Sequence, residues 1–368
     1  MKATTIAWGL VGAAAAVGVA CSQRPSDPAA ETAMAATAAS SAPAPEPAPS
    51  AATTTEINPR LLRRFQPLPQ VFEDEKNPRT PAKVDLGRML YFDKRLSKDG
   101  EQSCNSCHDL ANYGVDHQPF SVGHGKARGL RNAPTVYDAA GFFTQFWDGR
   151  APNVEEQSKG PLVNPIEMAM TDGAHVVSTL KAVPGYTDAF RRAFPGEAEP
   201  FTFDNVGRAI GAFERGLVTP SRWDDYLRGN ANALTPPEKE GFKTFLNVGC
   251  MVCHTGALLG GSMFERAGAA EPWPNQKDRG RQQVTKAAAD GMLFKVPTLR
   301  NVAKTAPYFH DASAATLPEA VQMMGRYQLG LELTPEEIAA IITWLDALTG
   351  EVPAAYVVEP ALPPGRGG

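Results

Sequence analysis

The sequence predicts a mainly α-helical protein with long irregular loops, built from two similar halves. Three observations indicate this fold class. Helix-start signatures, in which a capping Thr precedes Pro and then Glu, open apolar stretches of helical period at Thr235 and Thr334. No segment shows the convincing alternation of apolar and polar residues that a half-buried strand requires. The 33 Gly and 32 Pro residues of the chain indicate long loops around the helices rather than a compact bundle.

Composition is that of a soluble globular protein. The chain has 368 residues, of which 43% are hydrophobic and 21% are charged. That length suffices for about two packed domains. Its 36 basic and 40 acidic side chains give a formal charge of −4. Nucleic-acid binding requires clustered basic charge, so we expect no nucleic-acid partner.

The N-terminal segment is typical of an export signal. Residues 6–20 form an uncharged run of 15 residues, whereas a spanning helix needs roughly 20. Cleavage after Ala20 fits both ordinary signal processing and lipoprotein processing, which leaves a lipid-modified Cys21 first in the mature chain. We therefore predict a signal peptide over 1–20 and a periplasmic location. A lipid on Cys21 that tethers the protein to the membrane is favoured over plain export.

Residues 21–56 are predicted to form a disordered tether. From residue 22 onward they consist almost exclusively of Ala, Pro, Ser and Thr, and Pro alternates between positions 43 and 49. Such a segment buries too little apolar surface to offset the entropy of ordering. At about 3.1 Å per residue when extended, it would hold the folded body roughly 100 Å from an anchor.

Two Cys-x-x-Cys-His motifs carry the strongest functional signal, and they lie 146 positions apart. They comprise Cys104, Cys107 and His108 in the first half, and Cys250, Cys253 and His254 in the second. In this motif the two thiols add to the vinyl groups of a haem, and the histidine supplies the proximal ligand of its iron. Zinc ribbons separate their cysteine pairs by about 15–20 residues, and a redox pair needs no histidine. The motifs therefore predict two covalently bound c-type haems.

Each motif follows a predicted helix, which makes the two halves an internal repeat. The amphipathic stretch 85–92 leads to the first motif, and the helix that begins after Thr235 leads to the second. A further helix begins after Thr334 and ends near Gly350. We place the first haem domain over 57–220, the second over 221–350, and a C-terminal tail over 351–368.

The ligand on the far side of each iron distinguishes an electron carrier from an enzyme. Met324 lies 70 positions after His254, with Met323 beside it, and Met168 lies 60 positions after His108. Spacing therefore permits His/Met ligation at both haems, which is typical of a non-catalytic dihaem electron carrier. Spacing alone leaves that alternative open.

From about Asp85 to Gly350 the sequence resembles the bacterial dihaem cytochrome c peroxidases. Besides the haem motifs, the matching segments stand in family order, at residues 85–88, 123–125, 131–135, 145–150, 160–162, 167–168, 297–302, 307–310 and 324–325. The resemblance implies two cytochrome c-like domains, each with one haem. It also implies a periplasmic enzyme that reduces hydrogen peroxide to two waters with two electrons and two protons.

In this resemblance the first haem is the peroxidatic one. His124 resembles the histidine that caps its iron in the resting oxidised state and leaves when the second haem is reduced. Without the family resemblance, we would interpret His124 as a histidine on a surface loop. Glu167 resembles the catalytic glutamate that moves protons as the O–O bond breaks, and its neighbour Met168 then has no ligand role.

The second haem resembles the electron-entry haem of the family. The family pattern places its sixth ligand directly before glycine, which favours Met324 over Met323. Trp147 resembles a tryptophan that lies between the haems on the electron route, and a tryptophan that only packs in the core is the alternative.

The resemblance further implies a calcium ion and several partners. The calcium ligands would be the side chain of Asn132 and the backbone carbonyls of Thr305 and Pro307, which are hard oxygen donors. A small monohaem cytochrome c or a cupredoxin is expected to donate electrons. A homodimer is expected as well.

A second enzyme of the same superfamily is the main alternative. It matures a tryptophan-derived quinone on a partner protein, uses a tyrosine in place of the methionine ligand, and lacks the removable histidine. Met324 and His124 favour the peroxidase. Tyr327 is close enough in sequence to keep this alternative open.

Overall fold

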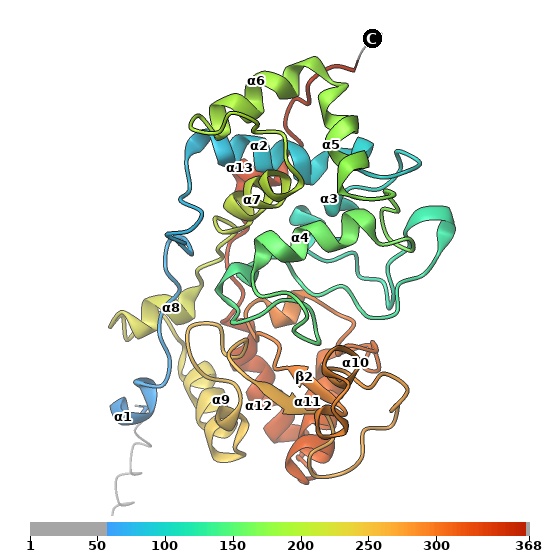
Figure 1. The fold of residues 1–368 in the computed structure, drawn as a ribbon. Helices are drawn as coiled ribbons and strands as arrows, with labels where there is room; N and C mark the ends of the chain where they lie inside the picture. Colours follow the sequence, from blue (N-terminus) through green and yellow to red (C-terminus); the bar gives the residue numbers. More distant parts are fainter. Residues whose placement is uncertain (1–56, 366–368) are drawn as a thin grey trace, which may run out of the picture. The chain divides into compact units, whose positions relative to one another are not determined.

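The computed structural model describes residues 57–365, which lie within one compact unit, Thr54–Gly368 (Figure 1). The predicted signal peptide, the lipid attachment at Cys21 and the tether all lie outside the described residues. Within the described range, no helix is both long and apolar enough to cross a membrane.

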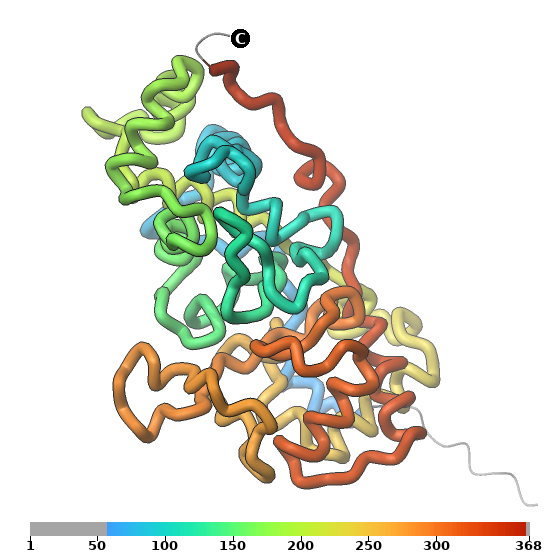
Figure 2. The backbone as a smooth tube through the Cα atoms, turned by 90° about the vertical axis from the view of Figure 1, so that its right-hand side faces the viewer, coloured from blue at the N-terminus to red at the C-terminus, as the bar shows by residue number. Residues whose placement is uncertain are grey.

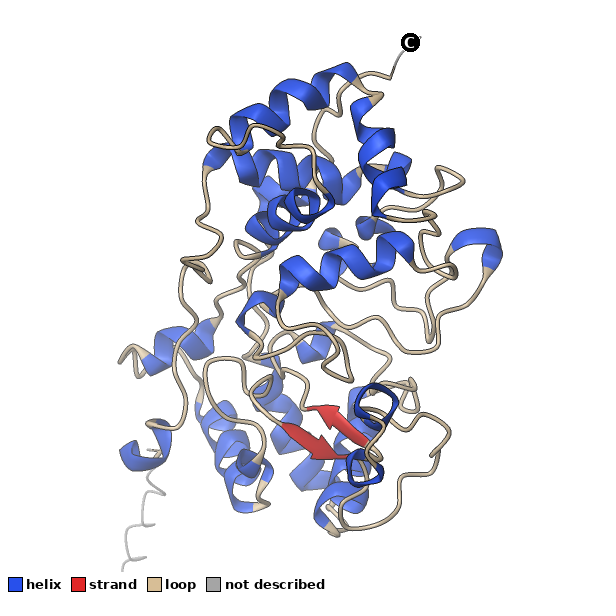
Figure 3. Cartoon of the chain, in the orientation of Figure 1, coloured by secondary structure: helices blue, strands red, loops and turns tan. Residues whose placement is uncertain are grey.

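Helices and loops dominate the described residues, which confirms the predicted helical class (Figure 3). The helices are α1 Pro59–Leu62, α2 Pro81–Phe92, α3 Cys104–Cys107, α4 Val154–Val163, α5 Gly173–Lys181, α6 Pro184–Ala193, α7 Phe203–Glu214, α8 Arg222–Leu227, α9 Pro236–Asn247, α10 Gln282–Thr285, α11 Leu317–Met323, α12 Pro335–Asp346 and α13 Ala354–Val357. One antiparallel pair, β1 Phe264–Arg266 with β2 Leu293–Lys295, was not predicted. Strands of three residues are too short to show an alternating pattern.

A first group of helices, α2 and α4–α7, packs around a buried apolar core in the upper part of Figure 1. Helix α2 begins at Thr80, whose hydroxyl accepts a hydrogen bond from the backbone N–H of Lys83. It crosses α7 at Gly87, where an added Cβ would lie 1.9 Å from the carbonyl oxygen of Ala209. Glycine therefore permits the close approach of the two helices.

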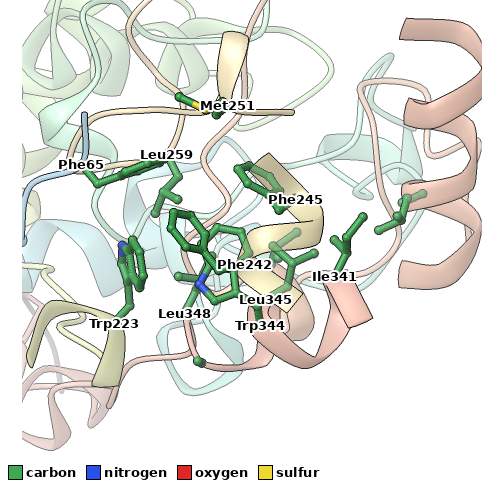
Figure 4. Packing of buried hydrophobic residues seen from close by; sticks show 14 of the residues in the cluster. Phe65, Trp223, Phe242, Phe245, Met251, Leu259, Ile341, Trp344, Leu345 and Leu348 are labelled. Carbon is green, nitrogen blue, oxygen red and sulfur yellow. The ribbon is translucent and has the colours of Figure 1, made fainter. Parts of the chain in front are cut away.

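A second group, α8, α9, α11 and α12, surrounds an aromatic-rich core (Figure 4). The capping boxes predicted after Thr235 and Thr334 are both formed, and they begin α9 and α12. Phe242 of α9 packs on Trp344 of α12, with ring centroids 4.8 Å apart. This crossing again depends on a glycine, because a Cβ at Gly241 would lie 2.0 Å from a carbonyl oxygen of α12.

Each end of the described chain packs against the group that is distant from it in sequence. Near the N-terminal end, Phe65 lies in the core of the second group, 5.8 Å from the ring of Trp223. The C-terminal segment runs back to the first group, where Tyr356 meets Phe213 edge to face at 5.4 Å (Figure 2). Much of the segment predicted as a tail is thus packed. The domain boundaries near residues 220 and 350 stay predictions.

A buried ion pair joins three separate segments beside the second motif. Arg300 donates to both oxygens of Asp224 at 2.6 and 2.9 Å, and both side chains are fully buried. The backbone N–H of Leu68 donates to the same carboxylate at 2.7 Å. Losing one partner of such a pair costs about 3–5 kcal/mol, so this contact holds the 297–302 stretch in place.

Candidate haem-binding and active site

The first Cys-x-x-Cys-His motif lines a cavity of about 880 Å³, here called the first cavity. Its two cysteines begin and end the short helix α3. Ser106 steadies the start of that helix, because its hydroxyl accepts a hydrogen bond from the backbone N–H of Ser103 at 2.9 Å. Local chain geometry therefore turns Cys104, Cys107 and His108 toward one cavity.

The imidazole of His108 is oriented for metal ligation. Its Nδ1 lies 2.9 Å from the carbonyl oxygen of Pro134. A carbonyl can only accept, so Nδ1 carries the proton and Nε2 has a free lone pair. Burial lowers the pKa of His108, which keeps the ring neutral. A neutral imidazole with a fixed tautomer fits the proximal ligand of a haem iron.

The second motif repeats this arrangement in another cavity of about 240 Å³, here called the second cavity. Cys250, Cys253 and His254 follow the end of α9 and line the cavity. The Nδ1–H of His254 donates to the carbonyl oxygen of Leu259 at 2.9 Å. Burial likewise lowers the pKa of His254, so its Nε2 is also available to a metal.

The four cysteines have the properties of attachment points rather than of reactive thiols. None of them forms a disulfide. Burial raises the pKa of Cys107 to about 11 and that of Cys250 to about 12, whereas redox motifs depress it. Among residues 57–365 no three His, Cys, Asp or Glu side chains gather as a metal ion would need. These features disfavour zinc and thiol redox chemistry and fit thioether attachment of haem.

The predicted sixth ligand of the second haem lies in the wall of the second cavity. Met324 opens a π-helical turn, Met324–Leu329, directly after α11 and lines that cavity. Met323 packs against two apolar clusters, one of which also contacts Met324, and it does not line the cavity. Tyr327 packs on Trp273 with ring centroids 5.5 Å apart. Of the described residues, only Met324 of these three contributes to the cavity wall.

Glu167 lies in the wall of the first cavity together with His108. The amide of Asn164 donates to its Oε1 at 2.8 Å. Burial raises the pKa of Glu167, although Arg150 and Asn164 partly oppose the shift. Its neighbour Met168 is 4% exposed, belongs to the core of the first helical group and also lines the first cavity. The structure thus presents a carboxyl group that can exchange protons beside the first motif.

The structure places the side chain of His124 outside the wall of the first cavity. Its Nδ1–H donates to Oδ2 of Asp99 at 2.7 Å. The backbone remains close to the cavity, because Gly123 lines it and the N–H of His124 donates to the carbonyl oxygen of Glu167 at 2.8 Å. Gly125, with a φ of 61°, makes the following turn. The loop is therefore anchored at the cavity rim while its histidine faces Asp99.

Trp147 lines both cavities. Its indole N–H donates to the carbonyl oxygen of Asn132 at 2.9 Å, and its ring meets that of His310 at 6.2 Å. Trp147 therefore lies between the two cavities, and its half-buried ring also packs against an apolar cluster.

The three predicted calcium ligands, Asn132, Thr305 and Pro307, all line the second cavity. The side-chain amide N–H of Asn132 donates to the carbonyl oxygen of Gln118 at 2.9 Å. This orientation leaves the amide oxygen of Asn132 available to a cation. The calcium site itself stays a prediction.

Several polar residues of the site were not predicted. Lys295 and His310 line both cavities, Glu214 lines the first, and Asp99 holds His124. His310 stood in a segment that resembles the family, but nothing in the sequence indicated its burial. Burial raises the pKa of Glu214 to about 8, so the protonated form of this carboxyl group predominates at neutral pH.

Two cavities that each have a Cys-x-x-Cys-His motif in the wall, with Glu167 beside the first motif, are the arrangement expected of a dihaem c-type protein. Known proteins match it closely. Residues 81–232 match the family model described as di-haem cytochrome c peroxidase. The cytochrome c551 peroxidase of Pseudomonas aeruginosa is 44% identical over 306 residues, which cover 81% of this chain and 87% of that protein.

Two further matches agree with this one. The cytochrome c551 peroxidase of Nitrosomonas europaea is 44% identical over 292 residues, or 77% of this chain and 85% of that protein. The crystal structure of a MauG-like protein associated with microbial copper homeostasis superposes with a TM-score of 0.71. It is 31% identical and covers 80% of this chain and 97% of its own.

The chain therefore belongs to the di-haem cytochrome c peroxidase family. It is an oxidoreductase of the cytochrome c peroxidase class. Family membership implies two haems, which the two motifs fit.

Proposed function

We propose that the first cavity is the peroxidatic site and that the second cavity receives electrons from a small periplasmic cytochrome c or cupredoxin. The overall reaction takes hydrogen peroxide, two electrons and two protons to two waters. The observation that carries this assignment is Glu167, a half-buried carboxyl group with a raised pKa in the same cavity as His108. Such a group is what O–O cleavage requires next to a haem.

Each cavity contains the residues that would hold one haem. Cys104 and Cys107 would attach the first haem through thioether bonds, and Nε2 of His108 would ligate its iron. When bound, this haem supplies an iron that binds peroxide and carries oxidising equivalents. Glu167 takes a proton from one peroxide oxygen and returns it to the other. Asn164 holds the carboxylate in position at 2.8 Å throughout.

The second cavity is assigned to electron entry. His254 on one side and Met324 in the wall would give its haem two protein ligands, which leaves no open position for peroxide. Trp147, in the wall of both cavities, would lie on the route between the haems. His124 would cap the first haem in the resting state, and its contact with Asp99 would hold it once it has left the iron.

Other parts of the proposal depend on the sequence and on the family. A signal peptide over 1–20 and a lipid on Cys21 would place the enzyme in the periplasm at the membrane. Mass spectrometry of the mature N-terminus tests both. A calcium ion at Asn132, Thr305 and Pro307, and a homodimer, belong to the same proposal.

Steady-state turnover of hydrogen peroxide with reduced cytochrome c tests the function. The assay should compare the oxidised holoenzyme with the half-reduced form, in which one electron has been added. We expect turnover in the half-reduced form, accompanied by a high-spin signal from one haem in its EPR spectrum. The absence of peroxide turnover in the half-reduced enzyme would contradict the proposal.

Side-chain placement favours the peroxidase over the quinone-maturing alternative, and the turnover assay separates it from the carrier. In a carrier, Met168 would ligate the first iron, and because Met168 lines the first cavity beside Glu167, its placement does not separate the carrier from the peroxidase. In the quinone-maturing enzyme, a tyrosine would replace the methionine ligand. Tyr327 lies outside the lining of the second cavity, whereas Met324 is part of it.

A further inference from the structure

The two cavities share one wall, which we call the shared wall. The residues that line both cavities are Asn132, Ala133, Pro134, Thr135, Phe142, Phe146, Trp147, Lys295 and His310. Most of this wall is apolar or has an assigned contact. Lys295 and His310 are its two ionisable side chains, and neither has a function in the mechanism above.

Lys295 is a buried cation without a protein acceptor. It ends β2, its backbone N–H donates to the carbonyl oxygen of Trp147 at 2.8 Å, and its side chain is only 6% exposed. The ammonium lies over the ring of Phe142, 3.7 Å from the centroid. Within residues 57–365 no carboxylate, carbonyl or hydroxyl accepts a hydrogen bond from it. A buried ammonium in this state is costly unless an anion compensates it.

The nearest acid does not supply that compensation. Asp148 raises the pKa of Lys295, but burial outweighs it and lowers the pKa to about 7. The carboxylate of Asp148 is already engaged by Arg131 at 2.5 Å and by Arg150 at 3.1 Å. The protein surroundings therefore leave the Lys295 charge largely unbalanced.

His310 adds a second unpaired polar atom to the same wall. Its side chain is 3% exposed and stacks on Phe294 with ring centroids 4.0 Å apart. Its Nε2 is buried without any hydrogen-bond partner in the described part of the chain. Buried polar atoms in folded proteins are partnered in the great majority of cases. Two unpaired polar groups on one wall therefore indicate a partner that comes from the cavities.

We propose that Lys295 binds a carboxylate of the bound cofactor, with His310 as a second contact. A haem carries two propionate carboxylates, and Lys295 lines both of the cavities that the haems would occupy. This inference depends on haem occupancy of the cavities, which is part of the proposed function, but it does not depend on peroxide chemistry.

An ion pair between Lys295 and a propionate would change the reduction potential of the haem. Reduction adds one negative charge to a haem, and a fixed cation in a wall of low dielectric favours that added charge. Lys295 therefore raises the reduction potential of at least one haem. It acts as a positioning residue and does not touch peroxide.

The test compares Lys295→Met and Lys295→Arg in the holoenzyme. Midpoint potentials of both haems are measured by spectroelectrochemical titration, and resonance Raman spectra report the propionate bending bands. We expect Lys295→Met to keep both haems attached, lower at least one midpoint potential and shift a propionate band. Lys295→Arg should restore most of the wild-type potential, because it keeps the charge.

Lys181→Met is the matched control. The ammonium of Lys181 also lies over a phenylalanine ring, 5.6 Å from the centroid of Phe201, but Lys181 is exposed and lines neither cavity. Its potentials and Raman bands should equal those of the wild type.

Unchanged potentials and Raman bands in Lys295→Met would overturn the proposal. An equal decrease in midpoint potential in Lys295→Met and Lys295→Arg would also overturn it. The shape of the side chain, and not its charge, would then account for the wild-type potential. If Lys295→Met does not assemble, His310→Phe provides the second variant, and a propionate band identical to that of the wild type would count against the shared site. Because none of these readouts uses peroxide, a failure here is distinct from a failure of the proposed activity.

Discussion

Glu167 shows how its surroundings change the acidity of a single side chain. An exposed glutamate is fully ionised at neutral pH, whereas burial raises the pKa of Glu167 and so makes the protonated form more accessible. Its hydrogen bond from Asn164 fixes the direction of the carboxyl group. Both properties are required of a group that must accept a proton and then deliver it.

The variant Glu167→Gln should keep both haem spectra and lose most peroxide turnover. Glutamine has nearly the same shape but cannot accept and return a proton, so we expect a decrease in kcat of about 10²–10⁴-fold. Steady-state kinetics at saturating peroxide measures this. Glu199→Gln, on an exposed residue that lines neither cavity, is the control. An unchanged rate in Glu167→Gln would remove Glu167 from its proposed role.

The hydrogen bond between Asp99 and His124 is a second side-chain contact that affects the first cavity. It holds the histidine away from the first cavity, and Asp99 is the acceptor that makes this position favourable. The hydrogen bond also lowers the pKa of Asp99, which keeps its carboxylate ionised. The position of His124 therefore depends on a residue 25 positions earlier in the chain.

The variant Asp99→Ala should shift His124 back toward the cavity. We expect a larger low-spin fraction of the first haem in the half-reduced enzyme and a slower onset of turnover. EPR spectroscopy of samples at matched reduction gives the fraction directly. The control is Asp188→Ala, an exposed aspartate on α6. If the spin-state ratio of Asp99→Ala equals that of the wild type, the contact does not control the loop.

At the scale of helices, two glycines permit the crossings that position the haem motifs. Gly87 lies where α2 meets α7, and Gly241 lies where α9 meets α12. Helix α2 precedes the first Cys-x-x-Cys-His motif, and α9 precedes the second. The halves therefore repeat a packing arrangement as well as a sequence motif, since the helix that delivers each motif is held closely against a second helix.

The variant Gly241→Ala should destabilise the protein by about 1–3 kcal/mol. Its Cβ would lie 2.0 Å from the carbonyl oxygen of Ala340, so the two helices would have to separate. Thermal unfolding of the holoenzyme, followed by far-UV circular dichroism, should show a lower Tm. Gly196→Ala is the control, because its added Cβ meets no atom within 4 Å. Equal Tm values for the two variants would contradict this account of the crossing.

Long elements with capping residues were predictable from the sequence, whereas short elements without them were not. Helices α9 and α12 begin with Thr-Pro and a glutamate that completes the capping box, and the sequence revealed both. Strands β1 and β2 escaped prediction, because three residues cannot display a period. The packing of the segment after Gly350 on the first helical group also escaped prediction, since it depends on a long-range contact of Tyr356 with Phe213.

At the scale of the whole molecule, the shared wall is the feature that brings distant parts of the chain together. It combines the 132–147 stretch with β2 and with His310, so residues more than 140 positions apart meet between the cavities. The packing also brings the N-terminal and C-terminal segments across to distant helical groups. Contacts of this kind bind the described residues into one compact unit.

The sequence was sufficient for the haem motifs, the fold class and the family, because these features lie in short contiguous segments. Covalent attachment requires two thiols and an imidazole within five residues, and this arrangement does not depend on the rest of the chain. The partner of His124, the choice of Met324 for the cavity wall and the buried charge of Lys295 required the tertiary structure. Burial and pairing depend on which distant segments cover a side chain, because desolvation is a property of the folded surroundings and not of the residue.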